Sequence, residues 1–295
     1  MDIDHQVIQP VGDSQGGDPQ PGNAITGVTT MSAGTFDLTA RDETWVKRVL
    51  PVLKLVAKKY FRSEVRGMDK VPDGGVLLVS NHSGGLMAFD VPVISVAFAD
   101  QFGADRPLYT LAHDLIFTGA GKDVFGKFGF LPAHPKNAVA ALKAGAATIV
   151  FPGGEWEVLR PTSESATIDF HGRTGYIRTA LEAGVPIVPI VTIGGQETQL
   201  FLNRGDALAK LLRLDKLLRI DSAPFAFGFP FGLTAHFPPN IPLPSKLVTE
   251  VLDPVDITAE FGTNPDHDEV DQMIRKRMQH ALDGLARERR FPVLG

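Results

Sequence analysis

The chain has 295 residues, of which 43% are hydrophobic and 21% are charged, so it can form one large folded core or two small ones. The formal net charge of −5 gives no reason to expect a nucleic-acid partner, and the absence of cysteine excludes disulfides, thiolate metal sites and a cysteine nucleophile, while fitting a reducing compartment. No apolar run reaches the roughly 18 residues that cross a bilayer, and no signal-peptide pattern opens the chain, so we expect any membrane contact to be peripheral.

The first 40 residues are rich in Gly, Pro, Asp, Gln and Thr and show little apolar periodicity. Such a segment cannot bury enough surface to offset the entropy of ordering it. We therefore predict that residues 1–40 are disordered and that residues 41–295 form the folded domain.

Residues 43–61 alternate apolar and basic side chains at helical spacing, with Pro51 expected to kink or divide the helix. The apolar positions include Trp45, Val49, Leu53 and Val56. One interpretation is a surface helix that packs on the core. The other is a basic amphipathic helix on an anionic membrane. The basic residues are Lys47, Arg48, Lys54, Lys58 and Lys59.

The middle of the chain alternates strand-like and helix-like patterns, which predicts an α/β fold with a central sheet flanked by helices. Strands are expected at 76–80, 108–112, 148–151 and 187–193, with a late strand at 246–252. Helices are expected at 91–99, 136–144, 174–183, 200–219 and 268–287. The run 225–231, FAFGFPF, carries no charge and is either a buried strand and turn or a lip that contacts lipid.

Polar residues and glycines follow all four central strands. The segments are NHSGG after residue 80, HD after residue 112, PGGE after residue 151 and GGQE after residue 193. If these strands are parallel neighbours, the segments meet beyond the carboxyl ends of the strands, where open α/β sheets bind ligands. Paired glycines let the backbone approach a ligand and can offer N–H groups to a developing oxyanion.

His82 is the candidate general base, because a free imidazole titrates near neutral pH. The next carboxylate along the chain is Asp90, which a straight helix would leave too far away to bond to His82. Gly84-Gly85 could fold the segment back, or Asp90 could simply cap the helix that follows. No G-x-S-x-G, phosphate loop, G-x-G-x-x-G or H-E-x-x-H occurs, and the eight histidines are scattered, so we expect no metal.

Four blocks resemble the glycerolipid acyltransferases of the lysophosphatidate acyltransferase superfamily, in particular the branch similar to mono- and diacylglycerol acyltransferases. They are SNHSGGLMAFD, GFLPAHPKNAVAALKAG, VFPGGEWEVLR and VPIVPIVTIGG, in that order. The resemblance implies an α/β acyltransferase fold with a mostly parallel sheet and an acyl thioester co-substrate such as acyl-CoA. It implies no cofactor and a glycerolipid acceptor such as lysophosphatidate or another lysophospholipid. It also implies a peripheral enzyme at the cytoplasmic face of a membrane.

The resemblance also implies roles for individual residues. His82 would be the base and Asp90 its partner, although seven residues separate them where the family has four. The family arginine that contacts an acceptor phosphate has no clear match in the second block, which offers His134 and Lys136 instead. Arg160 and Arg173 could also replace it. The residues implied to contact substrate are Asn81, Ser83, Gly84, Gly85, Lys136, Gly153, Gly154, Glu155, Arg160 and Arg173.

Three alternatives stay open on the same residues. The acceptor could be neutral diacylglycerol, which would make the product triacylglycerol. Water could replace the acceptor, which would make the protein a thioesterase. The protein could also bind lipid without catalysis.

Overall fold

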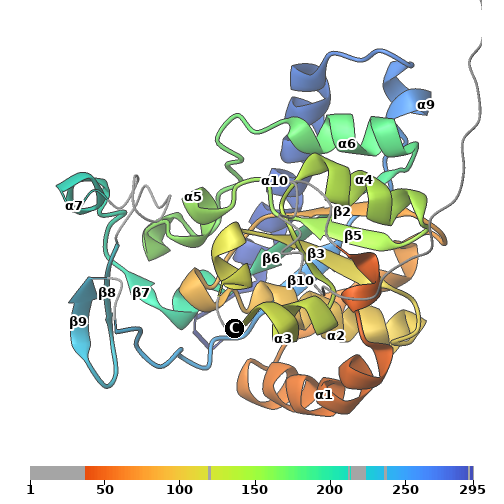
Figure 1. The fold of residues 1–295 in the computed structure, drawn as a ribbon. Helices are drawn as coiled ribbons and strands as arrows, with labels where there is room; N and C mark the ends of the chain where they lie inside the picture. Colours follow the sequence, from red (N-terminus) through yellow and green to blue (C-terminus); the bar gives the residue numbers. More distant parts are fainter. Residues whose placement is uncertain are drawn as a thin grey trace, which may run out of the picture. The chain divides into compact units, whose positions relative to one another are not determined.

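The computed structural model describes residues 37–118, 121–211, 213, 224–235, 238–291 and 293–294 (Figure 1). Most of the segment predicted to be disordered, residues 1–36, lies outside the described residues. In the described part of that segment, Leu38–Ala40 form a 3₁₀ turn, and the Leu38 carbonyl accepts a 2.9 Å hydrogen bond from the Tyr109 hydroxyl.

Within the described residues, a seven-stranded sheet forms the centre of the fold (Figure 1). Its strands are, in spatial order, β1 (Glu64–Arg66), β10 (Val248–Val251), β6 (Ile187–Ile193), β2 (Val76–Ser80), β5 (Ala147–Val150), β3 (Leu108–Ala112) and β4 (Phe130–Pro132). The five strands from β6 to β4 are parallel, and β10 runs antiparallel to β6. This confirms the predicted mostly parallel sheet. The four central strands are parallel neighbours, which is the condition on which the expected site depends.

Two helical layers cover the sheet, which explains why β2 and β6 are buried on both faces and read as continuous apolar runs. Alternate residues of β2 belong to different cores: Leu77 packs with α6 and α10, and Leu78 packs with α2. The principal helices are α1 (Glu43–Leu55), α2 (Asp90–Phe102), α3 (Gly121–Lys127), α4 (Pro135–Lys143), α6 (Gly175–Ala183), α9 (Ile257–Phe261) and α10 (His267–Glu288).

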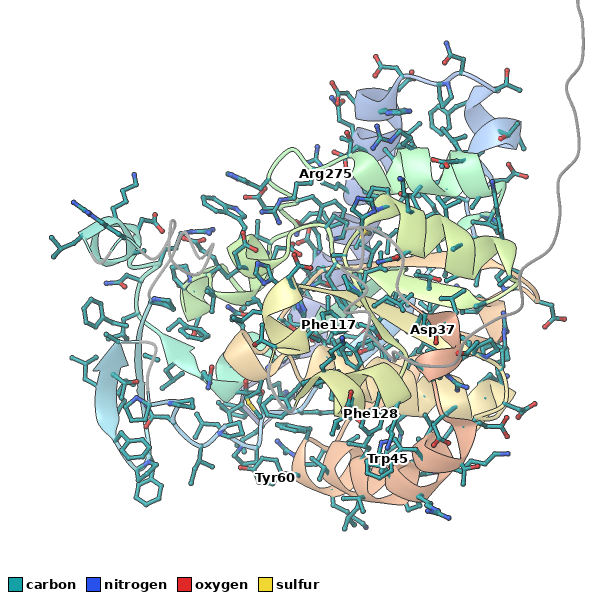
Figure 2. All side chains as sticks on the ribbon, in the orientation of Figure 1. Asp37, Trp45, Tyr60, Phe117, Phe128 and Arg275 are labelled. Carbon is teal, nitrogen blue, oxygen red and sulfur yellow. The ribbon has the colours of Figure 1, made fainter. Side chains whose placement is uncertain are left out.

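Helix α1 lies outside α2, on the face of the sheet opposite α6 and α10 (Figure 1). It runs through Pro51 and continues into a π-helical turn at Val56–Tyr60. Trp45 packs edge to face on Phe128, with ring centroids 6.3 Å apart (Figure 2). Among the described residues, no helix has both the length and the apolar character to cross a membrane.

The predicted helix at 200–219 is wrong at its start. Leu200–Phe201 form β7, which pairs with β8 (Phe225–Gly228), and β8 pairs with β9 (Gly232–Ala235) in a second sheet. Phe201 is buried against Ala226 of β8, so packing overrides the local helical pattern. A short helix, α7, follows at Asp206–Leu211.

Candidate active site

The predicted juxtaposition at the carboxyl edge of the sheet is present. β6, β2, β5 and β3 are parallel neighbours, so the segments that follow them leave the sheet at the same edge. The segment after β2 carries His82, and the segment after β5 leads into the short helix α5 (Glu155–Val158).

The structure brings His82 and Asp90 together despite the seven intervening residues. The Nδ1 atom of His82 lies 2.8 Å from Oδ2 of Asp90, and the side chains are 16% and 0% exposed. Oδ2 also accepts a 2.7 Å bond from the Ser83 N–H, and Oδ1 accepts a 2.9 Å bond from the Val91 N–H at the start of α2. Asp90 is therefore placed to orient the imidazole. It is the first residue of α2 and not its N-cap, because Phe89 holds that position and no side chain caps the helix, so the N-cap interpretation of Asp90 is wrong.

Two glycines in left-handed backbone conformations turn the chain back between His82 and Asp90. Gly84 has φ of 99° and Gly85 has φ of 59°, values that residues with a side chain rarely adopt. A Cβ at Gly84 would lie 2.8 Å from the Phe89 nitrogen, and one at Gly85 would lie 2.1 Å from Oε1 of Gln199. Space and backbone conformation together require glycine at both positions.

Glu157 is a site residue that the sequence analysis missed. Its carboxylate is fully buried and accepts a 2.8 Å bond from the His82 N–H and a 3.0 Å bond from the Asp169 N–H. Burial raises the pKa of the Glu157 carboxyl, while the Arg160 guanidinium, 2.8 Å away, and the two N–H donors act in the opposite direction. Glu157 thus holds the backbone of His82 in place.

Arg160 does not occupy the predicted substrate-binding position. The residue is 3% exposed, and its guanidinium bonds to Glu157 and to the backbone carbonyls of Glu157, Glu164 and Thr167. A guanidinium that is buried and engaged in this way cannot reach a phosphate in the cavity. We therefore correct its role to that of a structural counter-ion for Glu157.

The buried side-chain amides of Asn81 and Gln196 connect the segments that follow the central strands. The Asn81 side chain exchanges two hydrogen bonds with the backbone of Thr192 in β6, at 2.9 and 2.8 Å. The Gln196 side chain donates to the carbonyls of Val158 and Arg160 and accepts from the Gly84 N–H at 3.3 Å. Asn81, predicted to contact substrate, instead joins the end of β2 to β6.

Glu155 and Arg173 line the cavity beside His82 and form an ion pair, with Nη2 and Oε1 3.0 Å apart. Arg173 also donates to the carbonyls of Pro152 and Gly153, at 3.2 and 3.0 Å. A Cβ at Gly154 would lie 2.8 Å from the Arg173 Nη1 atom, so glycine makes room for this guanidinium.

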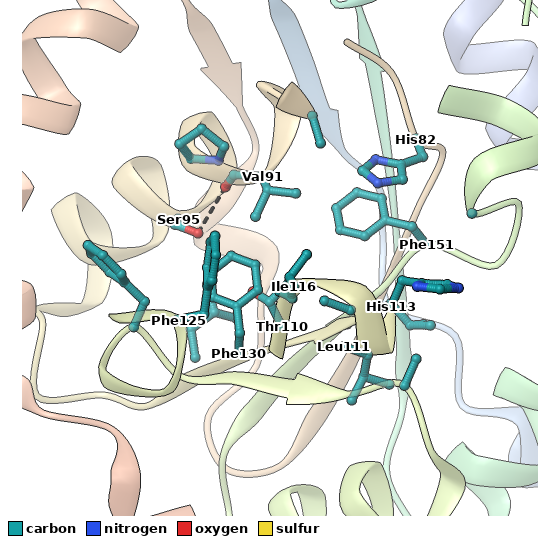
Figure 3. A pocket seen from close by; sticks show the side chains of 18 of the residues that line it. His82, Val91, Ser95, Thr110, Leu111, His113, Ile116, Phe125, Phe130 and Phe151 are labelled. Atoms are coloured by element: carbon teal, nitrogen blue, oxygen red, sulfur yellow. Dashed lines mark hydrogen bonds between the residues drawn. The ribbon is translucent and has the colours of Figure 1, made fainter. Parts of the chain in front are cut away.

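A cavity of about 1070 Å³ opens at His82 and runs between α2, β3, β4 and α1. Figure 3 shows His82 beside Phe151 at one end, with Ser95, Phe125 and Phe130 further along. The rings of His82 and Phe151 stack, with their centroids 4.2 Å apart. Most of the lining is apolar, and the wall formed by α1 consists of Val46, Leu50 and Leu53.

The predicted substrate-contacting residues divide into two groups. Gly85, Gly154, Glu155 and Arg173 line the cavity together with His82. The remaining residues do not belong to the described lining: Asn81, Ser83, Gly84, Lys136, Gly153 and Arg160. Ser83 is buried, Lys136 is exposed in the first turn of α4, and a Cβ at Gly153 would collide with the Glu157 side chain.

Other residues of the site carried no recognisable sequence signal. The cavity-lining residues Ser95 and Thr110 belong to a predicted helix and a predicted strand, where they read simply as part of the core. Phe125 and Phe130, which also line the cavity, belong to α3 and β4, two elements that the sequence analysis did not predict. Glu157 lies in the VFPGGEWEVLR block, three residues before Arg160. This spacing, which allows an ion pair across one helical turn, was the only feature of the sequence that could have pointed to Glu157. Among the described residues, no group of three His, Asp or Glu side chains is arranged to hold a metal ion.

Comparisons with known proteins agree with this geometry. Residues 62–193 match the acyltransferase family model. An uncharacterised protein of Mycobacterium tuberculosis is 32% identical over 263 residues, which cover 84% of this chain and 68% of that protein. The mouse DGAT1/2-independent enzyme synthesizing storage lipids is 30% identical over 190 residues, which cover 64% of this chain and 55% of that enzyme.

The crystal structure of PlsC from Thermotoga maritima, a 1-acyl-sn-glycerophosphate acyltransferase, shares the fold. It superposes with a TM-score of 0.51, at 18% identity, over 82% of each chain. The mostly parallel sheet flanked by helices agrees with this match in fold. The chain therefore belongs to the glycerolipid acyltransferase superfamily, whose members transfer acyl groups.

Proposed function

We propose that the protein transfers a long-chain acyl group from an acyl thioester, such as acyl-CoA, to the hydroxyl of a neutral glycerolipid such as diacylglycerol. The observation that carries this proposal is that the His82–Asp90 pair opens onto a long, mostly apolar cavity. His82 acts as the general base, and no resident cofactor takes part.

The hydrogen bond from Nδ1 to Asp90 leaves Nε2 of His82 available to the acceptor. Nε2 takes the proton of the acceptor hydroxyl as its oxygen attacks the thioester carbonyl carbon, and Asp90 stabilises the imidazolium that forms. The tetrahedral intermediate then collapses, the carbon–sulfur bond breaks, and the leaving thiolate takes the proton from His82. The products are an ester and a free thiol.

Gly85 is the glycine best placed to donate an N–H to the oxyanion. Gly84 and Gly154 already donate their N–H groups, to Gln196 and to the Phe151 carbonyl. Gly153 is absent from the described cavity lining, whereas Gly85 belongs to it. The backbone conformation that brings Asp90 to His82 therefore also presents Gly85 to the cavity.

The cavity fits the acyl chain of the donor. It follows α2, whose 13 residues span roughly 20 Å. One leaflet of a bilayer has a hydrocarbon depth of roughly 15 Å, so a chain of membrane-lipid length fits along this helix. The far end is lined by Gly103, Ala104 and Arg41, and Arg41 donates to the Ala104 carbonyl at 2.6 Å.

The cations near His82 favour a neutral acceptor over the lysophospholipid suggested by the sequence. Arg160 is buried against Glu157, and Arg173 is held by Glu155 and two carbonyls. Recruiting Arg173 to a phosphate would break that arrangement and bring a second anion beside Glu155. The name of the mouse relative, an enzyme synthesizing storage lipids, agrees with a neutral product.

We also place the protein on the cytoplasmic face of a membrane as a peripheral enzyme. Its lipid substrates reside there, and α1 presents basic side chains beside exposed Val52 and Leu55. A reducing compartment agrees with the absence of cysteine.

The test is to incubate purified protein with labelled acyl-CoA and, separately, monoacylglycerol, diacylglycerol, glycerol phosphate, lysophosphatidate or no acceptor. We expect labelled triacylglycerol from diacylglycerol and a loss of roughly 10²–10⁴-fold in His82→Ala, measured in folded protein. Faster turnover of lysophosphatidate would overturn the neutral acceptor. Acceptor-independent release of fatty acid would establish a thioesterase, and wild-type activity in His82→Ala would remove His82 as the base.

A further inference from the structure

The hairpin formed by β8 and β9 exposes large apolar side chains. Phe227 and Leu233 are cross-strand partners and are 55% and 60% exposed. Phe229 and Phe231 in the turn are 73% and 55% exposed. Residues 224–235 contain no charged side chain. Exposed apolar groups of this size, gathered on one hairpin without charge, indicate a surface that contacts lipid or protein.

The inner side of the same hairpin adjoins the active-site cavity. Ala226 of β8 packs with Ala88, Val158 and Leu159, three residues that line the cavity. Phe201 of β7 joins this cluster, and its ring occupies the space where a Cβ at Gly85 would lie. The hairpin therefore stands at the wall of the cavity near His82, with its phenylalanines turned outward.

A short segment connects the hairpin to the end of α1. The Ile241 N–H donates to the Phe229 carbonyl at 2.8 Å, and Ile241 is 54% exposed. The next residue, Pro242, accepts a 2.6 Å bond from the Tyr60 hydroxyl. Exposed apolar side chains thus follow one another from the hairpin turn to Tyr60 and on to Leu55 of α1, which is 60% exposed.

This exposure is confined to part of the molecule. Among the described residues, none of the exposed large hydrophobic side chains belongs to α4, α6, α9 or α10, the helices that cover the opposite face of the sheet (Figure 1). One-sided apolar exposure fits a flat lipid surface.

Charged residues also differ between the α1 side of the molecule and the α9–α10 side. Residues 43–60 carry five basic side chains and one acidic side chain, Glu43. Residues 253–288, on the opposite side, carry nine acidic and four basic residues. The acidic residues are Asp253, Asp256, Glu260, Asp266, Asp268, Glu269, Asp271, Asp283 and Glu288, and the basic residues are Arg275, Lys276, Arg277 and Arg287. This polarity would turn the α1 side toward an anionic bilayer and the α9–α10 side toward water.

We infer that the β8–β9 hairpin inserts its phenylalanines into a lipid bilayer and, together with the end of α1, holds the mouth of the cavity against the membrane. A lipid acceptor could then reach His82 from the bilayer along the hairpin. This inference extends the membrane placement of the proposed function, but vesicle binding tests it without any acyl transfer.

The test compares the wild type with Phe229→Ser/Phe231→Ser and with the matched control Phe229→Leu/Phe231→Leu. Flotation is measured with phosphatidylcholine vesicles, with and without phosphatidylglycerol, at low and high salt. We expect the serine variant to partition about ten-fold or more weakly and the leucine control to stay near wild type, because burial of apolar area drives insertion. This difference should persist at high salt, since it does not depend on charge.

A third variant, Phe229→Trp, reports directly on insertion. Its fluorescence should shift to the blue when vesicles are added and should be quenched by brominated lipid chains, beyond the response of Trp45 and Trp156 in the wild type. Circular dichroism checks that each variant is folded.

Equal flotation of the serine and leucine variants, or a tryptophan that stays in water, would overturn the inference. So would a serine variant that changes self-association in sedimentation without changing vesicle binding, because the hairpin would then be an interface between copies of the chain. Hairpin-dependent vesicle binding by a protein that shows no acyl transfer would preserve this inference and remove the proposed function.

Discussion

Replacing Asp90 by Asn tests the central geometry of the site, because the three hydrogen bonds of the carboxylate cannot all survive. If the new NH₂ group takes the place of Oδ2, it faces the Ser83 N–H, whose nitrogen lies 2.7 Å from Oδ2 in the wild type. It would then donate to Nδ1 of His82, which places the imidazole proton on Nε2 and prevents that atom from acting as a base. If NH₂ takes the place of Oδ1, it faces the Val91 N–H, 2.9 Å away. The second arrangement keeps the useful tautomer but removes the negative charge that stabilises the imidazolium.

In the second arrangement the Val91 N–H keeps an acceptor, because it also donates to the Ala88 carbonyl at 3.1 Å. The first arrangement leaves the buried Ser83 N–H without its acceptor, since the Asp90 side chain is 0% exposed. Such a loss should lower the free energy of unfolding by about 1–3 kcal/mol. The effect on the chemical step should be larger, roughly 10²–10⁴-fold in kcat, because the wrong tautomer or the missing charge acts on every turnover.

The assay is acyl transfer to diacylglycerol in vesicles at saturating acyl-CoA, together with denaturant unfolding of the same preparation. Asp100→Asn is a matched control: Asp100 lies on the same helix, and its exposed carboxylate pairs with Lys54 at 2.8 Å, away from His82. We expect the control to keep kcat. Near-wild-type kcat in Asp90→Asn would refute the pairing as a catalytic device and leave Asp90 with only its role at the start of α2.

Three further predictions concern the support of the site, the cavity and α1. Glu157→Gln should lower the free energy of unfolding by about 3–5 kcal/mol, because it leaves Arg160 buried without a counter-ion. Glu155→Gln, at a side chain that is 29% exposed, should lower it by under about 1 kcal/mol, and similar losses in urea unfolding would contradict the difference in burial. Ser95→Phe should narrow the cavity and lower kcat/KM for long acyl chains roughly ten-fold more than for short ones, whereas an equal loss for both would argue against this cavity as the acyl site. Glutamine at the five basic positions should weaken flotation with anionic vesicles, as should added salt on the wild type, and unchanged flotation would mean that the helix only packs on the core. These positions are Lys47, Arg48, Lys54, Lys58 and Lys59.

The sequence could predict the elements whose signal is local. The apolar runs at 76–80, 108–112 and 187–193 coincide with β2, β3 and β6, because a strand buried on both faces is apolar throughout. The predicted helices at 136–144 and 174–183 end within a residue of the observed α4 and α6, since glycine follows each. If these strands are parallel neighbours, their carboxyl ends meet at one edge of the sheet. The location of the site was therefore predictable on that condition.

The tertiary structure decided which side chain of each segment faces the substrate. Glu155 and Glu157 are two positions apart in one helical turn and point to nearly opposite sides, and only the packing of α5 determines that Glu157 points inward to the His82 N–H. Periodicity alone predicted a helix at 200–219, whereas pairing with β8, a segment 25 residues further on, makes Leu200–Phe201 a strand. The same pairing turns Phe227 outward and Ala226 inward, which sequence letters cannot specify because burial depends on partners distant in the chain. The sequence by itself determined the fold class, the positions of the central strands along the chain and the candidate base, whereas the order of the strands in the sheet came from the structure. The closure of Asp90 onto His82, the burial of Arg160 and the exposure of the hairpin required the folded chain, since each depends on contacts between segments far apart in sequence.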